Sequence, residues 1–335
     1  MLQLLRCFTA RHTDKGQTST FRLFIEQIVD CAPHVRSPLE GLPLSDQSAY
    51  ESIWTHLSTV AFRQGWIDAG GIKTRYVQAG PPDAPALVML HGTGGTWEAY
   101  CATIGPHSRY FNCFALDFLG SGYSEKPDHD YQITDYVEHV RNFMQAVGVA
   151  KTSFIGISLG SWVTAQFALT HPSMVEKITL NAPFGFADDE EEIGGILARR
   201  GRAYDDPSWE NIRKIFDSLI YSERKRIDDL VALRQSTYRL PEAKAASNHV
   251  LAIFGAPYLR SNLIGASEWR KIEAPALVVA SLKDRPLYLN TARKVSELMP
   301  RGRLLEMDGV GHWPQFENPE EFNAANIAFL REPTH

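Results

Sequence analysis

Short apolar runs alternate along the chain with segments of helical periodicity, and this alternation restricts the fold most. Residues 86–90, ALVML, form an unbroken apolar run, which is typical of a strand buried on both faces of a sheet. Further strands are predicted at 112–116, 153–157, 178–180, 276–280 and 303–307, and helices at 136–147, 161–169, 291–299 and 320–330. The alternation predicts an α/β fold, with a mostly parallel sheet covered by helices. A β-hairpin is predicted at 66–77, before the first strand of the parallel sheet.

Two regions interrupt the alternation. Residues 1–62 form a polar leader in which helices are predicted at 20–29 and 46–57, and residues 184–270 are charged and helix-prone without a clear buried strand. A segment as long as the second one is rarely a simple loop. We therefore expect an N-terminal extension at 1–62, a core at 63–183 and 271–335, and a helical lid at 184–270.

Composition excludes several classes of function. The 335 residues carry a net charge of -5 and no basic stripe, which argues against a nucleic-acid partner. The basic pair Arg199-Arg200 is interpreted as a solvated helix face. No apolar stretch is long enough to span a membrane, and the start does not resemble a signal peptide. A cytoplasmic protein without a membrane partner is therefore expected. The expected substrate is a small molecule. A homodimer is compatible with the sequence, which leaves the oligomeric state open.

Cysteine spacing and glycine-rich motifs give no sign of a cofactor. The four cysteines lie far apart and form no C-x-x-C pair, so zinc and redox motifs are not predicted; they are Cys7, Cys31, Cys101 and Cys113. The glycine-rich stretch at 91–95, HGTGG, lacks the Lys-Ser/Thr of a phosphate-binding loop. We expect neither a metal nor an organic cofactor.

The pentapeptide G-I-S-L-G at 156–160 places a serine where a buried strand ends and a helix begins. Side chains at such a turn stand at the carboxyl edge of the sheet, where α/β proteins bind ligands. Flanking glycines permit the tight turn that a nucleophile elbow requires. The position therefore predicts that Ser158 is a nucleophile.

A serine nucleophile needs a base and an acid that orients the base. His312 follows the last predicted strand and Asp284 follows the strand before it, so the order is Ser158, Asp284, His312. That order is typical of α/β-hydrolases and differs from the other two well-known triad orders. Asn181 stands where some relatives carry the acid but has no carboxylate, and Asp308 is too close to His312 along the chain to be preferred.

Acyl chemistry also needs N–H donors for the negative oxygen that forms on the carbonyl. We expect one donor to be the amide of Leu159, directly after the predicted nucleophile. The second is expected from the loop at 91–95, at Thr93, with Gly94 as the neighbouring alternative. His91, which precedes the glycine turn, is interpreted as structural.

These motifs together resemble the α/β-hydrolase superfamily over residues 63 to 332. The matching pieces are HGTGG at 91–95, DFLGSGYSEKP at 117–127, GISLGSW at 156–162, SLKDRP at 281–286 and GVGHWPQFENP at 309–319. The resemblance implies an eight-stranded, mostly parallel sheet with flanking helices and a helical lid. It also implies that Asp117 and its glycine turn are structural.

Within that superfamily the chain most resembles the meta-cleavage product hydrolases, on SEKPDHDYQITDYVEHV at 124–140, SLGSWV at 158–163, LVALR at 230–234 and GHWPQFE at 311–317. The resemblance implies cofactor-free hydrolysis of a carbon–carbon bond in a 2-hydroxy-6-oxo-dienoate during the breakdown of aromatic compounds. It assigns the substrate carboxylate to Arg234 on the lid. Trp313, directly after the predicted base, and Gly94 are further expected substrate contacts.

Two positions depart from the family pattern. Ile157 precedes the predicted nucleophile where many members carry Asn, and Ala99 stands where many carry a polar residue. Both changes make the predicted pocket less polar, so a carboxylesterase or lactonase with the same triad is the alternative. A non-enzymatic binder of the same fold is the alternative from another class, although the predicted triad and oxyanion loop are complete.

Overall fold

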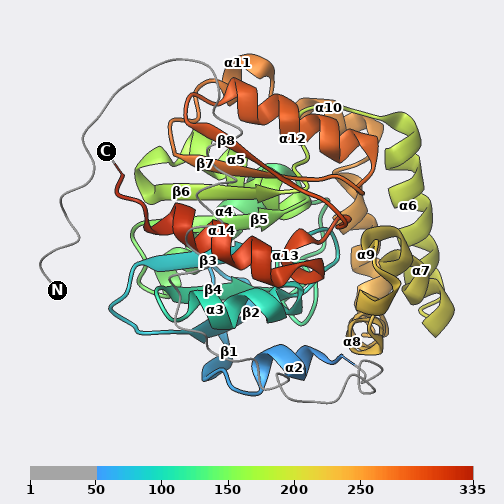
Figure 1. The fold of residues 1–335 in the computed structure, drawn as a ribbon. Helices are drawn as coiled ribbons and strands as arrows, with labels where there is room; N and C mark the ends of the chain where they lie inside the picture. The colour runs from blue at the N-terminus through green and yellow to red at the C-terminus, as the bar shows by residue number, and fades with distance from the viewer. Residues whose placement is uncertain (1–50, 335) are drawn as a thin grey trace, which may run out of the picture. The chain divides into compact units, whose positions relative to one another are not determined.

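The computed structural model describes residues 51–334 (Figure 1). The predicted helix at 20–29, and most of the predicted extension at 1–62, lie outside the described residues. Of the predicted helix at 46–57, the described part forms α2 (Ile53–Leu57). Among residues 51–334, no helix is both long enough and apolar enough to cross a membrane.

A single eight-stranded sheet forms the centre of the described chain, in the order β1-β2-β4-β3-β5-β6-β7-β8. The strands are β1 (Phe62–Asp68), β2 (Lys73–Ala79), β3 (Ala86–Leu90), β4 (Asn112–Leu116), β5 (Thr152–Ile157), β6 (Val175–Asn181), β7 (Ala276–Ser281) and β8 (Gly302–Met307). The pairs β1–β2 and β2–β4 are antiparallel, and every pair from β4 to β8 is parallel. The predicted mostly parallel sheet and its leading hairpin are confirmed.

Helices cover both faces of this sheet, because its central strands are apolar on both faces. Successive residues of a strand point to opposite faces. In β3, Leu87 and Met89 pack into one hydrophobic cluster, and Val88 and Leu90 into the other. The helices of the core are η2 (Trp97–Tyr100), α3 (Cys101–His107), α4 (Ile133–Ala146), α5 (Leu159–Thr170), η3 (Pro172–Met174), α12 (Pro286–Leu298), α13 (Pro314–Glu317) and α14 (Pro319–Arg331).

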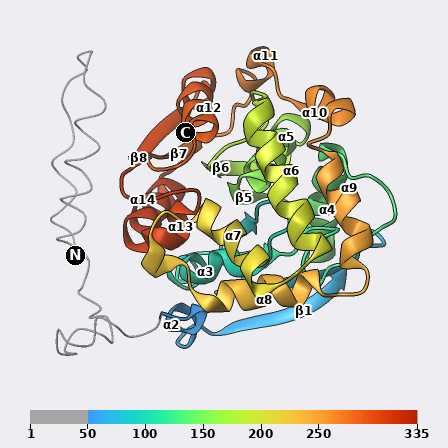
Figure 2. The ribbon, with the colours of Figure 1, turned by 90° about the vertical axis from the view of Figure 1, so that its right-hand side faces the viewer.

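The chain between β6 and β7 is helical. Its helices are α6 (Glu190–Asp205), α7 (Trp209–Leu219), η4 (Glu223–Lys225), α8 (Asp228–Tyr238), α9 (Ala243–Ala252), α10 (Ala256–Asn262) and α11 (Ala266–Trp269). Figures 1 and 2 place α6 to α9 together on one side of the sheet. We propose that this insertion is the lid expected at 184–270.

The residues just before β1 contact the helical insertion. The carboxylate of Glu51 accepts hydrogen bonds from Lys225 Nζ at 2.7 and 2.9 Å. The side chain of Asp229, in the first turn of α8, accepts from the Ser52 hydroxyl and, at 2.9 Å, from the backbone N–H of Ile53. One side of the insertion is thereby attached to the segment that leads into the sheet.

Candidate active site

Ser158 lies in a strained turn between β5 and α5. Its φ of 54° and ψ of -115° are unusual for a residue with a side chain. The turn is possible because Gly156 and Gly160 let backbones approach closely. A Cβ on Gly156 would lie 2.3 Å from the Gly160 carbonyl oxygen, and a Cβ on Gly160 would lie 2.0 Å from that of Leu90. The local geometry is that of a nucleophile elbow.

His312 and Asp284 form a buried pair at the ends of neighbouring strands. His312 follows β8 and Asp284 follows β7, and their Nδ1 and Oδ2 atoms are 2.8 Å apart. The two side chains are 3% and 2% exposed. The backbone N–H of His312 also donates to the carbonyl of Leu219, at the end of α7, at 2.8 Å. The pair predicted from the order along the chain is therefore in contact.

The charges around this pair favour a neutral imidazole beside an ionised carboxylate. Burial lowers the pKa of His312 below its usual value of 6.5, and Arg285 and Arg200 lower it further, against the opposing effect of Asp284. Burial favours the protonated form of Asp284, but His312 and Arg285 outweigh it, so the pKa of this carboxyl is lowered. A neutral His312 that donates from Nδ1 to Asp284 leaves Nε2 as an acceptor.

A pocket brings Ser158 and His312 together with Thr93 of the predicted oxyanion loop and with the insertion. Its lining residues are Thr93, Ser158, Ile196, Arg199, Arg200, Ile215, Ser218, Leu219, Phe254, Arg285, Tyr288 and His312. Two predicted catalytic side chains thus share one cavity, and Asp284 is in contact with one of them. The helical insertion supplies the wall opposite the sheet.

The predicted oxyanion donors lie next to the serine. Thr93 lines the pocket and is 4% exposed, and Leu159 is the first residue of α5. The first N–H groups of a helix have no intrahelical acceptor, so that of Leu159 is available to a ligand. Gly94 has a φ of 58°, in the left-handed region that favours glycine. The role of these amides stays a prediction.

The predicted oxyanion loop at 91–95 is held by His91, which is fully buried. Its Nε2 accepts from the backbone N–H of Phe118 at 2.9 Å, so its proton is on Nδ1, 2.7 Å from the carbonyl oxygen of Gly92. Burial lowers the pKa of His91 to about 3. A neutral ring with both nitrogens bonded to backbone fits the structural interpretation made from the sequence.

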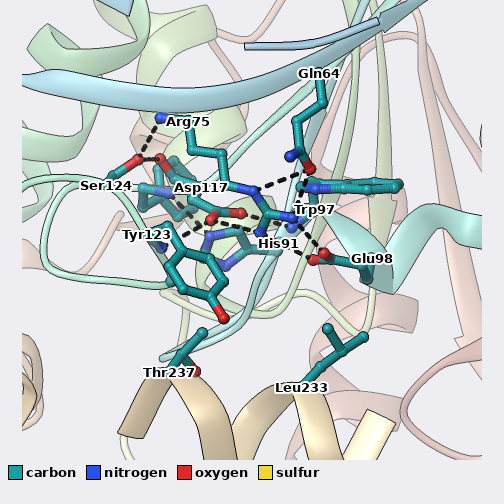
Figure 3. Close-up of polar contacts among 12 residues, drawn as sticks. Gln64, Arg75, His91, Trp97, Glu98, Asp117, Tyr123, Ser124, Leu233 and Thr237 are labelled. Carbon is teal, nitrogen blue, oxygen red and sulfur yellow. Dashed lines mark hydrogen bonds and ion pairs between the residues drawn. The ribbon is translucent and has the colours of Figure 1, made fainter. Parts of the chain in front are cut away.

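A buried ion cluster lies near His91 (Figure 3). Arg75 of β2 contacts the carboxylates of Glu98 at 2.6 Å and Asp117 at 3.2 Å. Asp117 also accepts from the backbone N–H groups of Trp97 at 2.9 Å and Tyr123 at 3.0 Å. Asp117 was expected to be structural, whereas nothing in the sequence connected Arg75 with Glu98, because they meet only once β2 and η2 are packed together.

The three residues predicted to bind substrate, Arg234, Trp313 and Gly94, are not among the residues that line the pocket. Arg234 and Trp313 are 4% and 5% exposed. Arg199, Arg200 and Arg285 line the pocket instead. The interpretation of Arg199-Arg200 as a solvated helix face is wrong, since Arg200 is only 8% exposed and both residues line the pocket. The helical periodicity of α6 was the sequence signal that could have shown that Arg199 and Arg200 face different surroundings.

The described residues offer no metal centre: nowhere in 51–334 do three or more His, Cys, Asp or Glu side chains gather so as to hold an ion. Of the four cysteines in the sequence, Cys101 and Cys113 are buried free thiols. Cys7 and Cys31 lie outside the described residues.

Known proteins share the fold and much of the sequence pattern. A family model described as alpha/beta hydrolase fold matches residues 85–319. The 2-hydroxy-6-oxo-6-(2'-aminophenyl)hexa-2,4-dienoic acid hydrolase of Metapseudomonas resinovorans is 26% identical over 285 residues, which cover 82% of this chain and 92% of that protein. Epoxide hydrolase 1 of Caenorhabditis elegans is 24% identical, over 80% of this chain and 71% of its own.

A solved structure agrees with these relatives. The 2-hydroxy-6-oxo-6-phenylhexa-2,4-dienoate hydrolase from a Rhodococcus species superimposes with a TM-score of 0.73 at 24% identity, and the match covers 82% of this chain and all of that one. At this identity the likeness supports the fold. Relatives that are named for different substrates match this chain, so the chemistry has to be argued from the pocket.

Proposed function

The chain belongs to the α/β-hydrolase family, and on that premise we propose that it hydrolyses a carbon–carbon bond in a 2-hydroxy-6-oxo-dienoate, with Ser158, His312 and Asp284 as the catalytic triad. The observation that carries the proposal is the shared pocket of Ser158 and His312, with Asp284 bonded to the imidazole. The activities for which the meta-cleavage relatives are named support the choice of substrate class.

The reaction begins with a proton shift in the substrate. The 2-hydroxy-dienoate becomes its 2-oxo form when the enol proton moves to carbon, and we assign the transfer of this proton to His312 Nε2. This step creates a saturated carbon next to the distal carbonyl. The bond between those two carbons can then break, because its electrons can return to the 2-oxo system.

Ser158 then adds to the distal carbonyl while His312 takes the hydroxyl proton. The amides of Leu159 and Thr93 stabilise the negative oxygen of the tetrahedral intermediate. The carbon–carbon bond breaks, its electron pair and a proton from His312 give the dienol, and the acyl group stays on Ser158. Water, deprotonated by His312, releases it as a carboxylic acid. Asp284 holds the imidazole in the Nδ1–H tautomer throughout.

Loss of colour of a yellow dienoate substrate measures the reaction directly. We expect Ser158→Ala to lower kcat by at least about 10³-fold, since only binding and the oxyanion donors remain. Asp284→Asn should lower kcat by about 10⁴-fold, because the amide favours the wrong tautomer of His312. Asp308→Asn is the matched control: this exposed carboxylate pairs with Lys283 at 3.5 Å, and its loss should leave kcat unchanged.

The outcomes separate the alternatives. Full turnover by Ser158→Ala would contradict a serine nucleophile. A wild-type protein that leaves the dienoate intact but cleaves p-nitrophenyl acetate would be a carboxylesterase or lactonase with the same triad. Ile157 and Ala99, both buried and apolar, would then be the sequence positions that had indicated it.

A further inference from the structure

One glutamate of the helical insertion faces the core, although its neighbours along the chain face solvent. Glu190, Glu191 and Glu192 form the first turn of α6. The first two residues are exposed, whereas the side chain of Glu192 is only 16% exposed. Burying a carboxylate is costly unless it is paired, so the burial of Glu192 requires a cation beside it.

That cation belongs to the core. The guanidinium of Arg285, the residue directly after the predicted acid Asp284, donates from Nη1 to Glu192 Oε1. Arg199 of α6 lies 3.8 Å from the same oxygen. The contact between Glu192 and Arg285 joins α6 to the loop that follows β7, so it requires α6 to lie against that loop.

Arg285 also lies beside the predicted base and the predicted acid. Its Nη2 is 3.3 Å from His312 Nδ1, and its Nε is 3.5 Å from Asp284 Oδ1. Arg285 Nε is buried and has no hydrogen-bond partner among residues 51–334. The guanidinium therefore keeps an unused donor close to the carboxylate that orients the imidazole.

Glu192 and Asp284 compete for this cation. Asp284 Oδ2 is 2.8 Å from His312 Nδ1, so the carboxylate has to stay available to the imidazole. A second carboxylate at Nη1 holds the guanidinium back and offsets its charge. Without that carboxylate, Arg285 would bind Asp284 more closely, and protonation of His312 would become less favourable.

We propose that Glu192 is a positioning residue for the catalytic pair. It holds the Arg285 guanidinium back from Asp284, so that the imidazole stays oriented and basic. Among the described residues, Glu192 is not one of those that line the pocket, so its effect reaches the substrate only through the pair. The consequence for turnover rests on the proposed function, in which His312 is the base. The arrangement of charges does not depend on the substrate.

The ionisable groups around His312 come from the core and from α6. They are Asp284, Arg285, Arg200 and Tyr288, whose ring centre is 4.4 Å from that of the imidazole. Burial lowers the pKa of His312, Asp284 opposes this effect, and the two arginines add to it. Of these groups, Arg285 is the one that contacts Glu192, so it transmits a change at Glu192 to the imidazole.

Titration of His312, followed by NMR in the full chain, tests the proposal without requiring turnover. Histidine labelled with ¹³C at Cε1 gives one signal for each ring, and the signal missing from His312→Gln identifies the ring of interest. We expect Glu192→Gln to move the titration midpoint to lower pH by at least about 0.5 pH unit, because a cation moves toward Asp284. Glu191→Gln, at the exposed neighbour on the same turn, is the matched control and should leave the midpoint unchanged.

A double variant shows whether the effect passes through Arg285. Arg285→Gln alone should move the midpoint to higher pH, and adding Glu192→Gln should cause no further change, because no cation is left to move. The same change in both backgrounds would mean that Glu192 acts by its own field, and would overturn the proposal. If Glu192→Gln fails to fold, Glu192→Asp keeps the charge on a shorter side chain and should give a smaller change in the same direction.

Kinetics with the yellow dienoate add a readout that a loss of packing would not give. Glu192→Gln should lower kcat by about three- to tenfold, because the base is weaker, and leave KM within about twofold of the wild type. A change in KM alone would overturn the role of Glu192. An unmoved titration midpoint in a variant of a protein that cleaves the dienoate sinks only the positioning role. A moved midpoint in a protein that leaves the dienoate intact sinks only the proposed function.

Discussion

The buried arginine of the sheet and the two buried arginines of the helical insertion have opposite electrostatic environments. Arg75 contacts two buried carboxylates, Glu98 and Asp117, and Asp117 in turn accepts hydrogen bonds from the backbone N–H groups of Trp97 and Tyr123. Arg200 and Arg234 are equally buried, but their polar neighbours are tyrosines. The paired arginine is expected to stabilise the fold, whereas the two arginines without a carboxylate partner are expected to contribute little to stability. Burial alone does not distinguish these roles, but the counter-ions do.

The largest expected effect is loss of stability at the paired arginine. Arg75→Met would leave Glu98 and Asp117 buried beside each other without their cation, and should lower the free energy of unfolding by about 3–5 kcal/mol. Chemical denaturation measures the change. Arg63→Met, at an exposed arginine of β1 that bonds Gln78, is the control and should change stability by no more than about 0.5 kcal/mol. Similar small changes in both variants would show that the buried cluster is not structural.

A smaller effect, on the pH dependence of activity, is expected at Arg285. This arginine contacts Glu192 and also lies 3.3 Å from His312 Nδ1. Burial and this guanidinium both lower the pKa of His312. Catalysis needs the neutral imidazole, so activity falls as the pH drops through that pKa. Arg285→Gln removes a positive neighbour and should raise the pKa of His312. The acid limb of the profile of kcat/KM against pH should therefore move to higher pH. A shift to lower pH, or none, would contradict this role.

The smallest effect on stability is expected at Arg200, which has no carboxylate partner. Arg200→Gln removes a buried charge that has no carboxylate partner, so the free energy of unfolding should stay within about 1 kcal/mol of the wild type or rise. The same denaturation experiment as for Arg75→Met provides the direct comparison. A loss as large as that of Arg75→Met would mean that Arg200 is part of the structural core and would remove the basis of the comparison.

The sequence predicted the core closely because its signals are local. The apolar run 86–90 coincides with β3, and the predicted strand at 112–116 coincides with β4. Helix α12 begins at Pro286, earlier than the predicted start at 291, because proline suits the first turn of a helix although it adds nothing to the apolar periodicity. The order of Ser158, Asp284 and His312 likewise needed only the positions of strand ends.

The lid was predicted only as a helical region, because several amphipathic helices can pack against a sheet edge in many ways. Arg199 and Arg200 are adjacent in sequence but point about 100° apart around α6. Only the packing of α6 against α8 and the oxyanion loop buries one of them beside Tyr238 and leaves the other near Glu192. For the same reason Arg234 could be placed on the lid but not behind the pocket wall.

Local patterns in the chain were therefore sufficient for the sheet, the turn at Ser158 and the strand ends that carry Asp284 and His312. Strand burial, turn geometry and helix periodicity depend on residues close together along the chain. The partners of Arg75 and the isolation of Arg200 and Arg234 were decided by tertiary structure alone. Pairing between charges depends on which distant segments meet in the folded protein, and residue type does not specify that.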